Sequence, residues 1–172
     1  KYNMQSFKEF LTNKEENINE MFNNPIPIRW TVTRNNNWKG EFVISSPEEQ
    51  KKYIINMIKL ENDMPWEIVF DLIQGKKKTQ DITGTGDAVQ VFSTVLNGIK
   101  QWISKVNPDA FILSAREPSR QSLYRRMLQL LPKKTWEVED LGTSFYVQNK
   151  NMKPSYSGFS DNDFDDYYND ED

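Results

Sequence analysis

The chain has 172 residues and a formal net charge of −3, and its five Trp, seven Tyr and ten Phe provide ample apolar surface for a folded core. It contains neither Cys nor His, which excludes disulfide bonds and zinc-thiolate centres and removes the commonest general base. Any catalysis must therefore use carboxylates, Tyr, Lys, Ser, Thr or backbone groups, and we predict no metal site. No apolar run approaches the roughly 20 residues of a membrane-spanning helix.

The first half of the chain predicts one helix followed by strands. Residues 3–22 carry an apolar stripe at helical spacing, which Pro25 and Pro27 end. The run 52–60 fits either a strand or a helix, and its place between other strands favours a strand. The predicted strands are a hairpin over 28–45 around an Asn-rich turn, then 52–60, 66–73 and 78–83. Together they predict an antiparallel meander.

The second half changes character. Apolar residues at the helical period predict a helix over 87–106, and the short apolar run 110–115 predicts a strand covered on both faces. A second helix opens at Pro118 and closes at Pro132, and a hairpin over 135–149 turns at Leu141-Gly142. The order predicts an α+β (mixed α/β) fold around one sheet. We expect the strand ending near Thr83 to pair in parallel with 110–115 through the 87–106 helix.

The stretch 81-DITGTGD-87 places two glycines between a predicted strand and a predicted helix. Free backbone N–H groups at the positive end of a helix dipole suit an anion such as a pyrophosphate. A plain tight turn would use the same residues, so the turn alone leaves both interpretations open.

The residues downstream of this turn resemble the GNAT N-acetyltransferase family over roughly residues 28–148. The family's Gln/Arg-x-x-Gly-x-Gly/Ala motif matches Asp81–Gly86, and its Asn-x-x-Ala-x-x-Leu-Tyr signature matches Glu117–Tyr124. Asp81, Glu117 and Arg120 depart from these motifs, so the catalytic motifs are degenerate. The opening QSFKEFL and the body also resemble tailed-bacteriophage proteins with such a fold.

The resemblance implies a GNAT-like sheet, mostly antiparallel with one parallel strand–helix–strand crossover, and an acyltransferase that uses acetyl-CoA. It implies that the cofactor pyrophosphate binds at the turn, through Ile82, Thr83, Gly84, Thr85, Gly86, Asp87 and Ala88. It also implies that Tyr124 is the general acid toward the leaving thiolate. Glu67 or Asp71 could serve as the base. Tyr124 lies on an apolar stripe, so packing explains it equally well.

Two clusters of polar residues allow further interpretations. Ser114, Arg116, Glu117, Ser119 and Arg120 suit either a second anion site or, preferably, a polar rim at a strand end. Basic side chains between 116 and 134 would suit nucleic acid, which makes a nucleic-acid-binding module a minor alternative.

Charge is concentrated at the C-terminus. Residues 154–172 hold seven acids and no Lys or Arg, and removing their −7 from the net −3 leaves +4 for residues 1–153. Such a segment buries little and repels itself, so we expect disorder. The tail is either a solvated appendage or, because it contains five aromatic residues, a segment that docks on a basic and partly apolar surface.

These observations predict three parts: an N-terminal amphipathic helix over 1–24, a GNAT-like domain over 25–150, and an acidic-aromatic disordered tail over 151–172. The N-terminus lacks the apolar core of a signal peptide, so we expect the host cytoplasm, with the virion as an alternative. The competing function is a non-catalytic virion-associated or host-interaction protein, with an unknown protein partner held through the tail and no membrane association.

Overall fold

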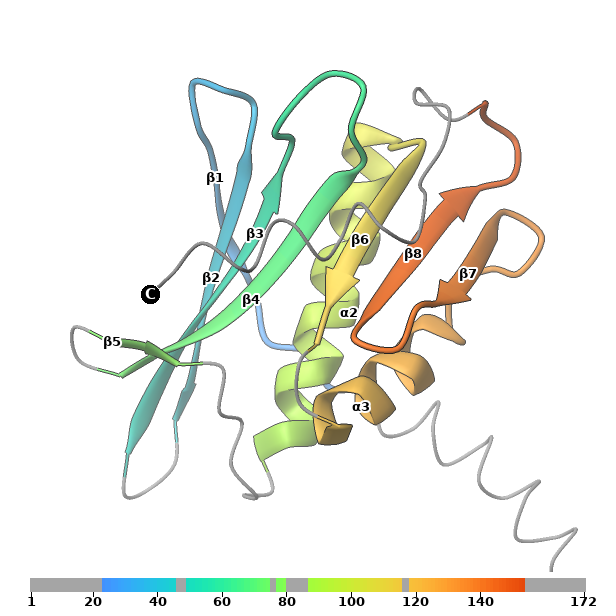
Figure 1. Cartoon of the computed structure of the whole chain (residues 1–172). Coiled ribbons are helices and arrows are strands. Elements are labelled where there is room, and N and C mark those ends of the chain that lie inside the picture. Colours follow the sequence, from blue (N-terminus) through green and yellow to red (C-terminus); the bar gives the residue numbers. More distant parts are fainter. Residues whose placement is uncertain (1–22, 46–48, 75–76, 80–86, 116–117, 154–172) are drawn as a thin grey trace, which may run out of the picture.

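Eight strands of the described residues form one sheet in the order β1-β2-β3-β4-β6-β8-β7, with β5 paired to β4 outside this path (Figure 1). The computed structural model describes residues 23–45, 49–74, 77–79, 87–115 and 118–153. The predicted N-terminal helix and the acidic tail lie outside these ranges, apart from a few residues at their inner ends. Within them the fold is mixed α+β, as expected.

The described elements follow the predicted order. The strands are β1 Arg29–Val32, β2 Trp38–Ser45, β3 Gln50–Ile58, β4 Trp66–Gln74, β5 Lys77–Thr79, β6 Ala110–Ser114, β7 Trp136–Asp140 and β8 Ser144–Asn149. The helices are α2 Asp87–Val106 and α3 Pro118–Leu128.

Strands β1 to β5 form the predicted antiparallel meander, and the segment that fitted either a strand or a helix is strand β3. The Asn-rich turn closes through bonds in which the backbone N–H of Thr33 and that of Asn36 donate to the carbonyls of Asn37 and Thr33. Asn36 adopts a φ of 59°, a left-handed conformation that Asn tolerates better than most residues. The hairpin prediction is therefore confirmed.

The two helices begin and end where the sequence provides start and stop residues. Asn107, with a φ of 48°, ends α2 directly before Pro108. Pro118 opens α3 at the first helical position, where its missing N–H costs nothing. The final hairpin turns at Gly142, whose φ of 89° favours glycine.

The parallel neighbour of β6 differs from the prediction. Strand β6 pairs in parallel with β4, at Trp66–Ile68, and not with the strand around 78–83. Within the described residues, β5 instead folds back antiparallel onto the last three residues of β4. Strand β5 makes its backbone hydrogen bonds to β4 within this short hairpin. After the crossover through α2, β6 therefore lies beside the longer strand β4 and not beside β5.

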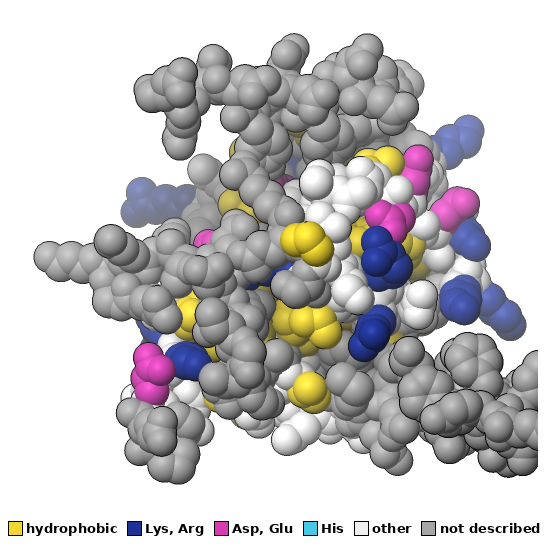
Figure 2. Space-filling model, turned by 60° about the horizontal axis from the view of Figure 1, so that its bottom comes forward, with side chains coloured by type: hydrophobic (Ala, Val, Ile, Leu, Met, Phe, Trp, Pro, Cys, Tyr) yellow, Lys and Arg dark blue, Asp and Glu magenta, His cyan; other side chains and the backbone are white. Residues whose placement is uncertain are grey.

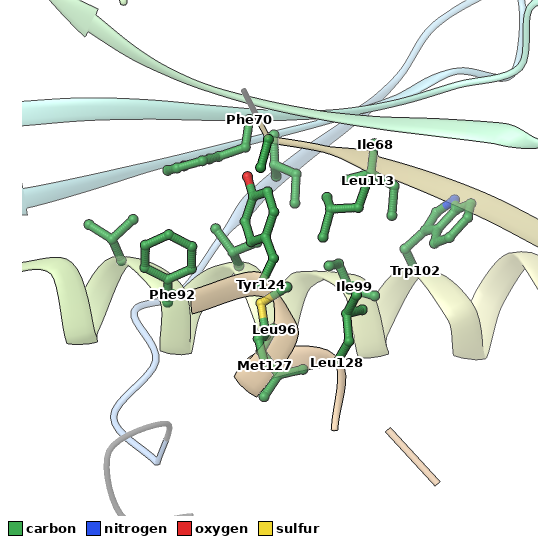
Figure 3. Close-up of a cluster of buried hydrophobic side chains, with 14 of the residues drawn as sticks. Ile68, Phe70, Phe92, Leu96, Ile99, Trp102, Leu113, Tyr124, Met127 and Leu128 are labelled. Carbon is green, nitrogen blue, oxygen red and sulfur yellow. The ribbon is translucent and has the colours of Figure 1, made fainter. Parts of the chain in front are cut away.

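The core lies between one face of the sheet and both helices. Figure 3 shows side chains of α2 and α3 pointing at the strands from the same side. Trp102 of α2 meets Trp66 and Phe111 at ring distances of 5.3 and 5.7 Å, and so ties the crossover helix to both parallel strands. Phe42, Tyr53 and Phe70 stack across β2, β3 and β4 on the same face.

Candidate functional site

The sequence-predicted site residues fall into two groups. Ile82 to Gly86 lie outside the described residues, and Asp87 and Ala88 are the first two residues of α2. Tyr124 is on α3, with only 1% of its surface exposed. The described part of the site is therefore the region around Tyr124.

Strands β4 and β6 pair over only three residues and then separate. Trp66–Ile68 lie beside Phe111–Leu113, while β5 takes the same edge of β4 further along, at Leu72–Gln74. Between these two pairings, residues 69–71 are paired only on the β3 side within the described chain. Figure 1 shows β4 and β6 diverging toward their C-terminal ends. In the part of the chain that the structure describes, the β4 edge at 69–71 therefore has no strand neighbour on the side of β6.

Arg120 of α3 occupies the position facing that edge. Its guanidinium Nη1 donates to the carbonyl oxygen of Phe70 at 3.4 Å, and its Cζ lies 5.6 Å from the centre of the Phe70 ring. Arg120 is only 3% exposed. The polar-rim interpretation is therefore wrong for this residue, because Arg120 is a buried cation at the strand divergence.

Tyr124 lies one helical turn after Arg120, on the same face of α3. Its ring packs edge-on against Phe92 at 5.5 Å, and Figure 3 shows its hydroxyl pointing toward the sheet near Phe70. The apolar-stripe interpretation of Tyr124 is therefore correct for its ring. Its hydroxyl, in contrast, lies in a polar setting with Arg120.

Burial sets the protonation of Tyr124. Desolvation raises the pKa of its phenol to about 12, the nearby charge of Asp71 adds to this rise, and the charge and hydrogen bonding of Arg120 oppose it. The phenol is therefore neutral at physiological pH and can donate a proton. The adjacent guanidinium would stabilise the phenolate that such a donation leaves.

The two candidate bases, Glu67 and Asp71, lie on the opposite face of β4 from Phe70, because side chains alternate along a strand. Desolvation raises the pKa of Glu67, which lies beside Ile112 in the paired part of the strand. Asp71 is 8% exposed and lies in the diverging part. Only Asp71 is electrostatically coupled to Tyr124, so it joins the site more directly than Glu67 does.

Sequence reasoning missed the role of Arg120. Arg120 and Tyr124 are four residues apart on one helix, which places them on the same face. The sequence signal that could have indicated a buried Arg120 is its position four residues before Tyr124, which belongs to an apolar stripe. It is a weak one, since most such arginines lie in solvent.

A hollow of about 410 Å³ lies between α3 and the final hairpin. Val138, which is 39% exposed, contributes to its apolar lining. Arg125 on its wall forms an ion pair with Asp140 at 2.7 Å, and Figure 2 shows basic and acidic side chains interspersed on the right of this end of the molecule. The mixture of charges does not favour a nucleic-acid surface here.

A comparison with protein-family models, curated proteins and solved structures finds no match for this chain. Among the described residues, no group of His, Cys, Asp or Glu is arranged to hold a metal ion. In the same part of the chain, neither helix is long and apolar enough to cross a membrane.

Proposed function

We propose that this chain is a GNAT-like protein that binds an acyl-CoA where β4 and β6 diverge, and that it transfers the acyl group to an amine. The order β1-β2-β3-β4-β6-β8-β7, with one parallel pair joined through α2, supports the GNAT-like part of the proposal. The resemblance of residues 81–86 and 117–124 to the family's two motifs adds to it. The observation that carries the proposal is the buried, protonated Tyr124 beneath the strand divergence.

The described residues fit acyl transfer in their chemistry. Bound acyl-CoA would supply an acyl group activated as a thioester, and it would lie beside the β4 edge at residues 69–71, where Arg120 donates to the Phe70 carbonyl. Tyr124 would donate its proton to the leaving thiolate, and Arg120 would stabilise the resulting phenolate. Asp71 would take a proton from the attacking amine. The turn at 82–86, which the resemblance assigns to the pyrophosphate, lies outside the described residues.

Replacement of one hydroxyl tests the role of Tyr124. Tyr124→Phe keeps the ring on Phe92, so the free energy of unfolding should change by about 1 kcal/mol or less. Turnover of acetyl-CoA with amine acceptors should fall by about 10²–10⁴-fold, as expected for loss of a general acid. Tyr53→Phe is the matched control, because Tyr53 is another buried Tyr, on β3, and should leave turnover unchanged.

One observation favours a non-catalytic protein as a second candidate. Arg120 already bonds to the Phe70 carbonyl, and Tyr124 is almost fully enclosed. Both side chains could simply brace the sheet where two strands separate, while the fold serves as a host-interaction or virion-associated surface. In that case Tyr124→Phe lowers the melting temperature, and the parent protein neither binds nor turns over acetyl-CoA at millimolar concentration.

A further inference from the structure

The sheet face turned away from α2 and α3 carries two different surfaces. Side chains directly opposite each other in the register share a face, so one row across this face runs Glu41, Ile54, Asp71. A neighbouring row runs Ile58, Glu67, Ile112, Tyr146. The centre of the face is therefore apolar with a few carboxylates among the aliphatic side chains.

The centre of this face is an interior-like surface. Ile54 is 7% exposed and Ile112 is 8% exposed, whereas Val43, on the neighbouring β2, is 43% exposed. Both described helices pack on the other face, as Figure 3 shows. A sheet whose two faces are apolar needs a covering segment on each of them.

The outer third of the face, on β1 to β3, is basic. Arg29, Lys39 and Lys52 surround Glu41 at 2.5, 3.0 and 3.2 Å. Their side chains are 79%, 41% and 45% exposed, against 15% for Glu41. Three cations around one carboxylate leave a surplus of two positive charges that is open to solvent. An acidic segment would be attracted to this point.

We propose that the chain's own C-terminal segment, residues 154–172, docks across this face. Its first seven residues, PSYSGFS, carry two aromatic side chains and no charge, and all seven acids lie in the remaining residues from Asp161 on. This order matches the face, because a segment that leaves β8 meets the apolar centre first and the cations of β1 to β3 afterwards. The two aromatic side chains of the first seven residues would then contact the apolar centre, and the acids that follow would contact the cations of β1 to β3.

The lengths are consistent with this placement. Four strand spacings separate β8 from β2, which amounts to about 19 Å at about 4.8 Å each. Seven extended residues from Pro154 span up to about 23 Å at about 3.3 Å each. The first acid, Asp161, can therefore reach β3 and β2, the strands that carry Lys52 and Lys39.

The hollow beside α3 is the competing position for the segment. Its cations Arg125, Lys133 and Lys150 face the acids Glu137 and Asp140, and Arg125 is already paired with Asp140. The surplus there is one positive charge within a mixed lining. The cluster around Glu41 is the more favourable position, because three exposed cations share one carboxylate there, whereas the three cations of the hollow face two.

Because the chain contains no Cys, one engineered thiol can be labelled uniquely. A nitroxide on Ser160→Cys in the full-length protein should broaden backbone amide signals of Ile54, Ile112 and Val43 by more than half relative to the reduced label. Amides of Leu128 and Val138, beside the α3 hollow, should keep their intensity. The broadening should weaken at 1 M salt, where the Debye length is about 3 Å.

A charge variant separates this surface from the α3 side. The triple variant Arg29→Gln, Lys39→Gln, Lys52→Gln should restore most of the lost intensity at Val43. The matched variant Lys133→Gln, Lys134→Gln, Lys153→Gln removes three exposed cations elsewhere and should restore none of it.

Three results would overturn the proposal. The first is absence of broadening at every described amide, which would mean a solvated segment. The second is broadening confined to Leu128 and Val138, which would place the segment beside α3. The third is equal broadening when labelled, isotopically unenriched protein is mixed with unlabelled, enriched protein, which would assign the contact to a second copy.

Discussion

The meander of β1 to β4 and the crossover that carries β6 through α2 are built in different ways. In the meander every strand pairs with its neighbour in sequence, through short turns. In the crossover, the chain runs from β4 through β5 and the 20-residue helix α2 to β6, and β4 and β6 pair over three residues only. The candidate site lies at the second kind of junction. Neighbouring strands of the meander satisfy each other's backbone groups, whereas at the interrupted parallel pair the Phe70 carbonyl accepts a hydrogen bond from the Arg120 side chain.

The largest effect should come from the residue that fixes the crossover. Trp102 contacts Trp66 and Phe111, one on each parallel strand, and Trp102→Ala should lower the free energy of unfolding by about 3–5 kcal/mol. Val32→Ala, on the edge of the meander where Val32 is 51% exposed, should stay within about 0.5 kcal/mol. Urea denaturation of both variants measures the contrast, and equal losses would contradict the distinction between the two regions.

The indole N–H of Trp102 sharpens the same test. It has no hydrogen-bond partner within the described residues. Trp102→Phe should therefore cost far less than Trp102→Ala, because it keeps much of the ring packing and removes a buried donor. If the two variants are equally unstable, the indole N–H is satisfied in solution, and the packing account of Trp102 is incomplete.

A smaller loss is expected where the meander meets α2. A Cβ at Gly40 would lie 2.7 Å from Ile28, 2.8 Å from Ile55 and 2.9 Å from Trp30. Gly40→Ala should lower the free energy of unfolding by about 1–3 kcal/mol, as overpacking does. Gly98→Ala, where the close contact is with the end of the Ile28 side chain, should cost less. Thermal denaturation distinguishes the pair, and a reversed order would show that the segment at Ile28 is not held as described.

The final hairpin should respond to its turn by about 1 kcal/mol. Gly142 has a positive φ, and an added Cβ would meet no atom within 4 Å, so only backbone strain opposes Gly142→Ala. Gly142→Asn should be tolerated better, since Asn enters this conformation more easily. Equal melting temperatures for all three proteins would argue that the turn relaxes freely.

The smallest effect concerns the ion cluster at the meander edge, and it depends on pH. Hydrogen bonds from Arg29, Lys39 and Lys52 lower the pKa of Glu41 from 4.5 to about 2. Because the pKa of Glu41 is lower in the folded chain than in the unfolded chain, the ionised carboxylate stabilises the fold at a pH above about 4.5. This contribution disappears as the pH falls from about 4.5 toward 2. Glu41→Gln should therefore cost at most about 1 kcal/mol at pH 7, because the cations are largely solvent-exposed. A difference that persists at pH 2 would contradict this cause.

The local elements could be predicted because their signals are local. Alternating residues identified the hairpin of β1 and β2, the 3.6-residue period identified α2, and Pro118 identified the start of α3. Strand β3 was predicted only from its position between other strands, because its own residues fitted a helix equally well. The parallel partner of β6 could not be predicted in this way. An apolar run indicates that a strand is buried, but it does not indicate which strand lies beside it. Proximity in sequence favoured 78–83, whereas the pairing is with β4.

The candidate site was predictable only in part for a related reason. Tyr124 followed from its Leu-Tyr pair, and its buried ring followed from the apolar stripe. The burial of Arg120 and the separate positions of Asp71 and Glu67 depend on where two strands part, which no sequence window contains. Charged side chains at a strand divergence are buried by tertiary structure alone.

The most direct test of the central claim is a titration of the isotope-labelled full-length protein with acetyl-CoA, followed through backbone amide signals. Binding at the strand divergence should shift Val69, Phe70 and Ser114 in a saturable way, while Val32 and Val138, at the two ends of the sheet, stay unchanged. No shift at millimolar ligand, or saturable shifts confined to the sheet ends, would contradict acyl-CoA binding where β4 and β6 diverge.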